Sequence, residues 1–182
     1  GKLANLETLI SSLPIKGSIG IGHTRWATHG EPSARNAHPH LGATGKVVVV
    51  HNGIVENFIE LKEELLNDGV VFHSDTDTET IVHLVEKYLS TGESVENSVR
   101  KTLLRLKGAH GVVVMSTLEP DKIIAARIGN AGGVVIGLGE NENFIASDIP
   151  AILEHTRRLI FLESRQMAVV TKNTASITTL DG

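Results

Sequence analysis

The segment between Gly22 and His40 gathers several side chains that could do chemistry. Arg25 and Trp26, the only tryptophan, stand side by side there, and several histidines and hydroxyl groups surround them. Polar groups at that density cannot all be buried without partners, so the segment faces either water or a ligand. An arginine beside an indole suits a ligand with a carboxylate, because the guanidinium group can form a bidentate charged pair while the ring covers an apolar side.

The histidines of this segment, His23, His29, His38 and His40, raise the question of a zinc site. The chain contains no cysteine that could complete such a site. His38 and His40 do not have the i, i+4 spacing of a helical zinc-binding pair, and no carboxylate stands at the usual ligand spacing. We therefore predict no metal site and expect hydrogen bonds within a polar loop to hold these rings.

Two further positions place polar side chains at the boundary of a predicted element. Asn52-Gly53 follows a run of valines, and taken alone this pair is typical of a turn. Asp77 falls in the first turn of a predicted helix, where the helix dipole and the free N–H groups favour an ionised carboxylate. Asp77 could cap this helix, bind a cationic group of a ligand, or do both.

Hydrophobic periodicity predicts helices in the first half of the chain and consecutive strands in the second half. Helices are expected at residues 3–13, 56–68, 76–89 and 94–107. Strands are expected at residues 17–23, 46–51, 110–117, 122–128, 132–138, 143–147, 158–162, 166–171 and 176–180. Thr76 and Glu79 have the spacing of a capping box at the start of the third helix. This order predicts an α+β fold in which helices cover a mostly antiparallel sheet.

Length and composition narrow the class of protein. With 182 residues the chain can bury one sizeable core, and we predict a single domain. The net charge of −4 provides no basic surface for nucleic acid. No apolar run approaches the roughly 18 residues of a membrane span, and no signal peptide opens the chain, so the expected location is the cytoplasm. Because the chain begins with Gly1 rather than methionine, we expect it to be a piece of a larger polypeptide.

Several short motifs occur together along the whole chain. They are Gly22-His23-Thr24-Arg25-Trp26-Ala27-Thr28-His29-Gly30-Glu31-Pro32-Ser33, Asn36-Ala37-His38-Pro39-His40, His51-Asn52-Gly53-Ile54-Val55-Glu56-Asn57, Ser74-Asp75-Thr76-Asp77-Thr78-Glu79, Gly137-Leu138-Gly139 and Glu142-Asn143-Phe144-Ile145-Ala146-Ser147-Asp148. This combination resembles the glutaminase domain, a type 2 glutamine amidotransferase, of the glutamine–fructose-6-phosphate aminotransferase family. The resemblance implies the four-layer αββα sandwich of the N-terminal-nucleophile hydrolases. Residues 1–182 would then form a partial, N-terminally truncated glutaminase domain without the sugar isomerase domains.

The resemblance also assigns roles to residues of the site. It implies that Arg25 binds the α-carboxylate of glutamine and that Asp77 binds its α-ammonium group. Asn52 and Gly53 would form the oxyanion hole, since a side-chain amide N–H and an unhindered backbone N–H could converge on the oxygen of a tetrahedral intermediate.

The segment between Gly22 and His40, called the polar loop below, has a role of its own in the resemblance. Trp26, Thr28 and His29 would belong to a loop that closes over glutamine and excludes water. Thr28 would support the polar backbone atoms of the substrate. Trp26 would help to close the pocket, although the sequence alone leaves open whether this side chain is a lid or part of the core.

The reaction that the resemblance implies uses L-glutamine and no cofactor. Ammonia from glutamine would pass to a C-terminal sugar isomerase domain of the same polypeptide, where fructose 6-phosphate becomes glucosamine 6-phosphate, and the full enzyme would be a homo-oligomer. The nucleophile would be an N-terminal cysteine, so we expect the 182 residues alone to be inactive. Two alternatives stay open, namely a non-catalytic glutamine-binding or scaffolding module and a neighbouring type 2 amidotransferase.

Overall fold

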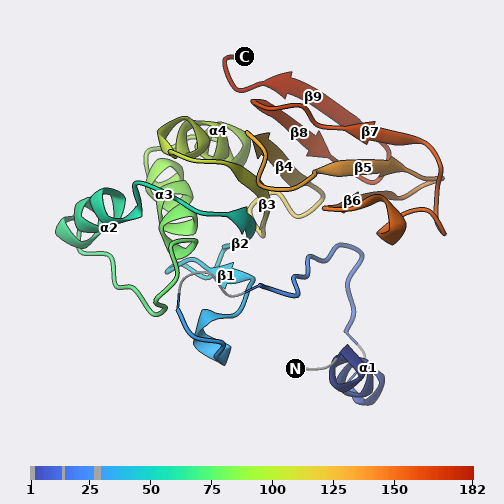
Figure 1. The fold of residues 1–182 in the computed structure, drawn as a ribbon, viewed down its shortest axis with the longest axis horizontal. Coiled ribbons are helices and arrows are strands. Elements are labelled where there is room, and N and C mark those ends of the chain that lie inside the picture. Colours follow the sequence, from blue (N-terminus) through green and yellow to red (C-terminus); the bar gives the residue numbers. More distant parts are fainter. Residues whose placement is uncertain (1–2, 14, 27–29) are drawn as a thin grey trace.

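The computed structural model describes residues 3–13, 15–26 and 30–182, and its fold is drawn in Figure 1. The elements follow in the order α1 (Leu3–Ser12), η1 (Ala34–Asn36), β1 (His40–Leu41), β2 (Val47–Gly53), α2 (Phe58–Asn67), α3 (Glu79–Ser90), α4 (Val95–Arg105), β3 (His110–Ser116), β4 (Ile123–Ile128), β5 (Val135–Leu138), β6 (Asn143–Ala146), η2 (Ile149–Ala151), β7 (Leu159–Phe161), β8 (Gln166–Val170) and β9 (Ala175–Thr179). Within this described part, no helix is long and apolar enough to cross a membrane.

The strands form two antiparallel sheets. The larger sheet has six strands in the order β1-β2-β3-β4-β8-β9, and the smaller sheet has three in the order β6-β5-β7. Side chains alternate across the larger sheet, as the strand period of two requires. Val112 and Val114 belong to the apolar core shared with the helices, whereas Val113 between them packs into the core shared with the smaller sheet.

The layers follow from these two cores. Helices α2, α3 and α4 cover one face of the larger sheet, and the smaller sheet lies beyond its other face (Figure 1). The outer face of the smaller sheet is covered by the segment that includes η2. There a Cβ at Gly137 would lie 2.4 Å from Ile152, and Phe144 stacks on His155 with 4.7 Å between ring centroids. The order of helices, sheet, sheet and a thin outer layer confirms the expected α+β sandwich.

Helices α2, α3 and α4 confirm three of the predicted helices to within a few residues. Ser94 caps α4, because its hydroxyl accepts a hydrogen bond from the backbone N–H of Asn97 at 3.2 Å. The predicted first helix is also present as α1, but none of its residues is buried. Leu3 is 65% exposed and Leu9 is 55% exposed, so the apolar side of α1 packs against nothing in the described structure.

The predicted strand at residues 17–23 is wrong. The chain is extended there and alternate residues such as Ile19 and Ile21 are half-buried, but it pairs with no strand of the described structure. The segment lies over the face of the larger sheet, lining cavities with Val48 and Val113 of β2 and β3. A strand forms only where backbone groups meet the edge of another strand, and a chain that crosses a face meets side chains instead.

The capping box predicted for Thr76 and Glu79 is also wrong. Helix α3 begins at Glu79, and the hydroxyl of Thr76 instead contacts Ser74 and His40 at 2.9 Å each. The carboxylate of Glu79 reaches further back along the chain and accepts hydrogen bonds from the backbone N–H groups of His73 and Ser74 at 2.7 Å each. The side chain of Glu79 therefore links residues five and six positions earlier to the start of α3, whereas the predicted capping box joins residues three positions apart.

One edge of β2 is only partly covered by a strand. β1 has two residues, and they pair with Val48 and Val49 alone. Beyond Val49, the backbone N–H of His51 donates to a side chain, the Nδ1 atom of His38, at 3.3 Å. The last residues of β2 therefore lie at a sheet edge where a loop, and no strand of the described chain, is the neighbour.

Candidate functional site

A cavity of about 130 Å³ lies at the end of β2, against the polar loop and the segment before α3. Among the residues that line it are Arg25, Trp26, Asn52, Gly53 and Asp77, which the sequence analysis had selected from three separate motifs. The structure thus brings together every predicted site residue that it describes. Thr28 and His29 lie outside the described residues.

Arg25 lies in the loop with its backbone in the left-handed region, at φ 45°. This conformation is uncommon for residues other than glycine, and it turns the chain sharply. The guanidinium group donates to the carbonyl oxygen of Gly30 at 3.0 Å and to that of Glu31 at 3.3 Å. Carbonyl groups are uncharged, so these two contacts orient the guanidinium group without cancelling its positive charge.

Trp26 is 92% exposed, which excludes the core position that the sequence left open. The side chain lines the cavity but belongs to no apolar core. A side chain this exposed is not part of the core, whereas its role in closing the pocket stays a prediction.

Asn52 and Gly53 are the last residues of β2 and not a simple turn. They pair with Gly111 and His110 of β3, and Gly53 has φ 130°, in a region that only glycine enters without strain. A Cβ at Gly53 would lie 2.1 Å from the carbonyl oxygen of Ala109. The backbone therefore passes so close to its neighbour that glycine is required at this position.

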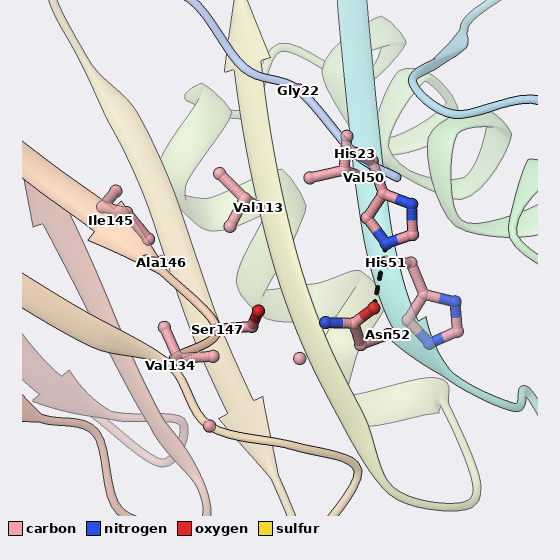
Figure 2. Close-up of a pocket in the computed structure, with 12 residues that line it drawn as sticks. Gly22, His23, Val50, His51, Asn52, Val113, Val134, Ile145, Ala146 and Ser147 are labelled. Atoms are coloured by element: carbon pink, nitrogen blue, oxygen red, sulfur yellow. Dashed lines mark hydrogen bonds between the residues drawn. The ribbon is translucent and has the colours of Figure 1, made fainter. Parts of the chain in front are cut away.

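The side chain of Asn52 reaches a second, adjoining cavity of about 100 Å³, which Figure 2 shows. His23, His51 and Asn52 line both cavities, and Ser147 lines the second one from the opposite side. The Oδ1 atom of Asn52 lies 2.9 Å from Nε2 of His23, while the amide nitrogen points away from that ring (Figure 2). The amide nitrogen is thus directed toward cavity space rather than toward a partner in the described chain.

Asp77 lies two residues before α3, so its predicted place in the first helical turn is wrong. Its side chain does not cap the helix, because Oδ2 accepts a hydrogen bond from the backbone N–H of Val55 at 2.7 Å. The residue is 3% exposed and lines the cavity. A buried carboxylate needs compensating partners, and a cationic group in the cavity would be a suitable one.

Behind Asn52 and Gly53 lies a chain of buried polar groups that the sequence analysis missed. His110 Nε2 contacts the carbonyl oxygen of Lys107 at 3.1 Å, His110 Nδ1 contacts His51 Nε2 at 3.1 Å, and His51 Nδ1 contacts the hydroxyl of Thr78 at 2.9 Å. A carbonyl oxygen only accepts, so His110 must donate to it from Nε2. It then accepts at Nδ1 from His51, which in turn accepts from Thr78. His51 and His110 each carry one ring proton, on Nε2, so both rings are neutral.

This chain links the end of β2 to the residue after Asp77. Burial lowers the pKa of His51 well below its usual value, and neighbouring histidines, His110 first, lower it further. Burial also lowers the pKa of His110. The signal in the sequence was a histidine on each of two valine-rich strands, but their contact depends on the register of the sheet.

The other histidines of the polar segment are held by hydrogen bonds and stacking. His38 lies between His23 and His40, with ring centroids 4.4 Å and 4.9 Å away. Burial, together with the charges of His23, His40 and Arg25, lowers the pKa of His38 to about 3. Among the described residues, no group of three or more histidine, aspartate or glutamate side chains is arranged to hold a metal ion.

We predict that the free energy of unfolding falls as the pH is lowered from 7.5 to 5.5. His38, His51 and His110 have lowered pKa values when folded, whereas each titrates near pH 6.5 when unfolded. Below pH 6.5 the unfolded chain therefore binds more protons, and each such histidine costs up to about 1.4 kcal/mol per pH unit, less where water screens it. Urea titrations at both pH values measure the change.

His38→Asn is a suitable comparison for this prediction. The amide oxygen of asparagine can replace Nδ1 as an acceptor, but it does not titrate, so the variant should lose stability less steeply with falling pH. Glu79 does not interfere in this range: burial raises its pKa, but hydrogen bonds from His83, His73 and Ser74 outweigh burial and hold the pKa at about 2. Equal stability of the unmodified chain at pH 7.5 and 5.5 would contradict the prediction.

Comparison with known proteins shows the family of the chain. The sequence matches the family described as a glutamine amidotransferase domain over residues 11–178. It is 48% identical over 181 residues to glutamine–fructose-6-phosphate aminotransferase (isomerizing) of Thermococcus kodakarensis, covering 100% of this chain and 30% of that protein. It is 51% identical over 177 residues to the enzyme of the same name from Haemophilus influenzae, covering 97% of this chain and 28% of that protein. The chain thus spans about 30% of the length of these relatives.

Solved structures support the same fold. Glutamine phosphoribosylpyrophosphate amidotransferase from B. subtilis superposes with a TM-score of 0.72 at 23% identity, covering 87% of this chain and 34% of that one. A structure described as the allosteric regulatory enzyme of purine biosynthesis superposes with a TM-score of 0.73 at 25% identity, with the same coverage of 87% and 34%. From its sequence and its fold, the chain belongs to the glutamine amidotransferase domain family.

Proposed function

We propose that the cavity at the end of β2 binds L-glutamine and that the domain hydrolyses the side-chain amide of this substrate. The observation that carries the proposal is the convergence of Arg25, Trp26, Asn52, Gly53 and Asp77 on one cavity. Arg25 and Asp77 provide opposite charges, as the zwitterionic end of an amino acid requires. Asn52 and Gly53 provide the amide and backbone N–H groups that a developing oxyanion requires.

The chemistry follows from these positions. A thiolate attacks the δ-carbon of glutamine, and the negative charge that develops on the amide oxygen receives hydrogen bonds from Asn52 Nδ2 and the Gly53 N–H. The C–N bond breaks as the leaving nitrogen takes up the proton that the thiol has lost, relayed by the α-amine of the same cysteine as the resemblance implies, and departs as ammonia. Water then hydrolyses the thioester to glutamate and regenerates the thiol. The adjoining cavity of about 100 Å³ offers space beside Asn52 for the attacking group.

The thiol in this proposal is the N-terminal cysteine that the family resemblance implies. The 182 residues contain no cysteine, so turnover is to be measured in a form in which a segment with this N-terminal cysteine precedes Gly1. We call this the cysteine-bearing form. Binding of glutamine needs no nucleophile and can be measured on the 182-residue chain itself.

We further propose that the ammonia serves to convert fructose 6-phosphate to glucosamine 6-phosphate in a C-terminal sugar isomerase domain of the same polypeptide. The support is the name shared by the relatives from T. kodakarensis and H. influenzae, of which this chain spans 30% and 28%. A homo-oligomeric enzyme in the cytoplasm completes the proposal and rests on the resemblance alone.

The binding part of the proposal is tested with Arg25→Ala. We expect L-glutamine to bind this variant about 10- to 100-fold more weakly than the unmodified chain, because hydrogen bonds between charged groups contribute about 1.5–3 kcal/mol. Isothermal titration calorimetry of the 182-residue chain with L-glutamine measures the difference.

Arg35→Ala is the matched control for this measurement. Arg35 carries the same charge in the same polar segment, but it forms an exposed ion pair with Asp75 and does not line the cavity. Its loss should leave glutamine binding within about threefold, as removal of an exposed ion pair costs little. The assignment of Arg25 fails if Arg25→Ala binds glutamine as tightly as the Arg35→Ala control does.

A further inference from the structure

His23 contacts both the backbone of the polar loop and the side chain of Asn52 at the end of β2. Its Nδ1 atom lies 2.9 Å from the backbone N–H of Arg25, and its Nε2 atom lies 2.9 Å from Oδ1 of Asn52. The ring also stacks on His38, with 4.4 Å between centroids and 29° between planes. Two hydrogen bonds and one stacking contact therefore determine both the position and the orientation of this imidazole.

The proton of the neutral His23 ring has only one place. A backbone N–H group can only donate, so Nδ1 of His23 must offer its lone pair to Arg25. The proton then resides on Nε2, which donates to Oδ1 of Asn52. The backbone N–H of Arg25 thus sets the tautomer of His23, and the Nε2 proton of this tautomer binds the amide oxygen of Asn52.

This arrangement decides which end of the Asn52 amide faces the cavity. With Oδ1 committed to His23, the amide nitrogen is left on the other side, directed toward the space lined by Ser147 (Figure 2). A flipped amide would set two donors against each other across 2.9 Å and would turn a carbonyl oxygen toward the site. An oxygen at that place would repel an oxyanion instead of stabilising it.

The backbone conformation of Arg25 makes its hydrogen bond to His23 possible. The left-handed backbone of Arg25, at φ 45°, turns its own N–H back onto the ring two residues earlier in the chain. The same residue carries the guanidinium group that lines the cavity. The conformation that places Arg25 therefore also fixes the tautomer of His23 and, through it, the amide of Asn52.

We propose that His23 is a positioning residue for amide hydrolysis: it holds the side chain of Asn52 with the amide nitrogen toward the reacting carbonyl oxygen. It acts through Asn52, to which its Nε2 atom is committed. The proposal rests on the proposed function for its chemical meaning, but the state of the His23 ring can be measured without any substrate.

The first experiment is nitrogen NMR of the histidine rings in the 182-residue chain, with His23 assigned by its absence in His23→Gln. We expect a neutral His23 with the proton on Nε2, and a shift of this resonance in Asn52→Ala, which removes the acceptor. A proton on Nδ1, or a His23 resonance unaffected by Asn52→Ala, would overturn the proposal whether or not the chain binds glutamine.

The second experiment compares two substitutions in the cysteine-bearing form. The amide nitrogen of glutamine can replace Nε2 as donor, whereas asparagine can replace only Nδ1 as acceptor. His23→Gln should therefore keep most of the turnover. His23→Asn should lose about tenfold in kcat with little change in the KM for glutamine, because one hydrogen bond that orients Asn52 is lost.

The two proposals fail in different ways. If the unmodified chain binds no glutamine, the proposed function fails, and the NMR result still decides whether His23 orients Asn52. If glutamine binds but His23→Asn turns over as fast as His23→Gln, or changes KM alone, only the positioning role fails. In the double variant His23→Asn/Asn52→Ala, the two losses in kcat should not add, since both act on one donor.

Discussion

Asn52→Ala is expected to lower kcat for glutamine hydrolysis by about 10²–10³ in the cysteine-bearing form, the usual effect of removing one oxyanion donor. The amide nitrogen of Asn52 faces the cavity, and its oxygen is held at 2.9 Å by His23, so this donor is already oriented before the charge develops. An oriented donor stabilises the transition state more than the ground state. The KM and the affinity for L-glutamine should therefore change much less than kcat.

The matched control is Asn67→Ala. Asn67 is the last residue of α2 and is exposed, so the same chemical change there touches neither cavity. Steady-state kinetics of both variants, together with calorimetry of glutamine binding, separate binding from turnover. If Asn52→Ala keeps the kcat of the Asn67→Ala control, the oxyanion role of Asn52 is wrong.

Gly53→Ala is expected to destabilise the domain by about 2–6 kcal/mol, the sum of backbone strain and overpacking at one position. The new Cβ would lie 2.1 Å from the carbonyl oxygen of Ala109 and 3.0 Å from Nε2 of His51, and φ is 130°. The end of β2 can relieve this contact only by moving away from β3. Turnover should be lost together with stability, because the proposed donor is the N–H of the same residue.

Gly45→Ala separates the two causes of this destabilisation. Gly45 also has a positive φ, of 71°, but a Cβ there would meet nothing within 4 Å. Its substitution should cost only the conformational strain, about 1–2 kcal/mol. Urea unfolding of both variants makes the comparison, and equal losses of stability would show that the close approach of Gly53 to Ala109 is unimportant.

Hydrophobic periodicity predicted the elements whose side chains enter the two cores. The valines of β2 and the apolar side of α3 are examples, because burial on one face leaves a regular pattern in the sequence. The same rule explains the error at residues 17–23. Ile19 and Ile21 alternate with exposed neighbours, as in a strand, but alternation reports which side is buried and not whether the backbone meets another strand.

The residues of the candidate site also divide into those that the sequence could predict and those that it could not. Arg25, Asn52 and Asp77 could be selected because each stands in a short motif with a recognisable composition. The contact between His51 and His110 could not, because it joins residues 59 positions apart and depends on the register between β2 and β3. The short segment β1 was missed as well, since two residues are too few to show a period.

The partly covered edge of β2 has a consequence for the dynamics of the site. Amides that donate to a neighbouring strand inside a sheet exchange mainly through large-scale unfolding, whereas amides held by a loop can exchange through local opening. The N–H of His51 is held by the ring of His38 and by no strand of the described chain. We therefore expect its exchange to follow loss of the contact with His38, so that this single amide would report on local opening at His38 while the sheet around it stays folded.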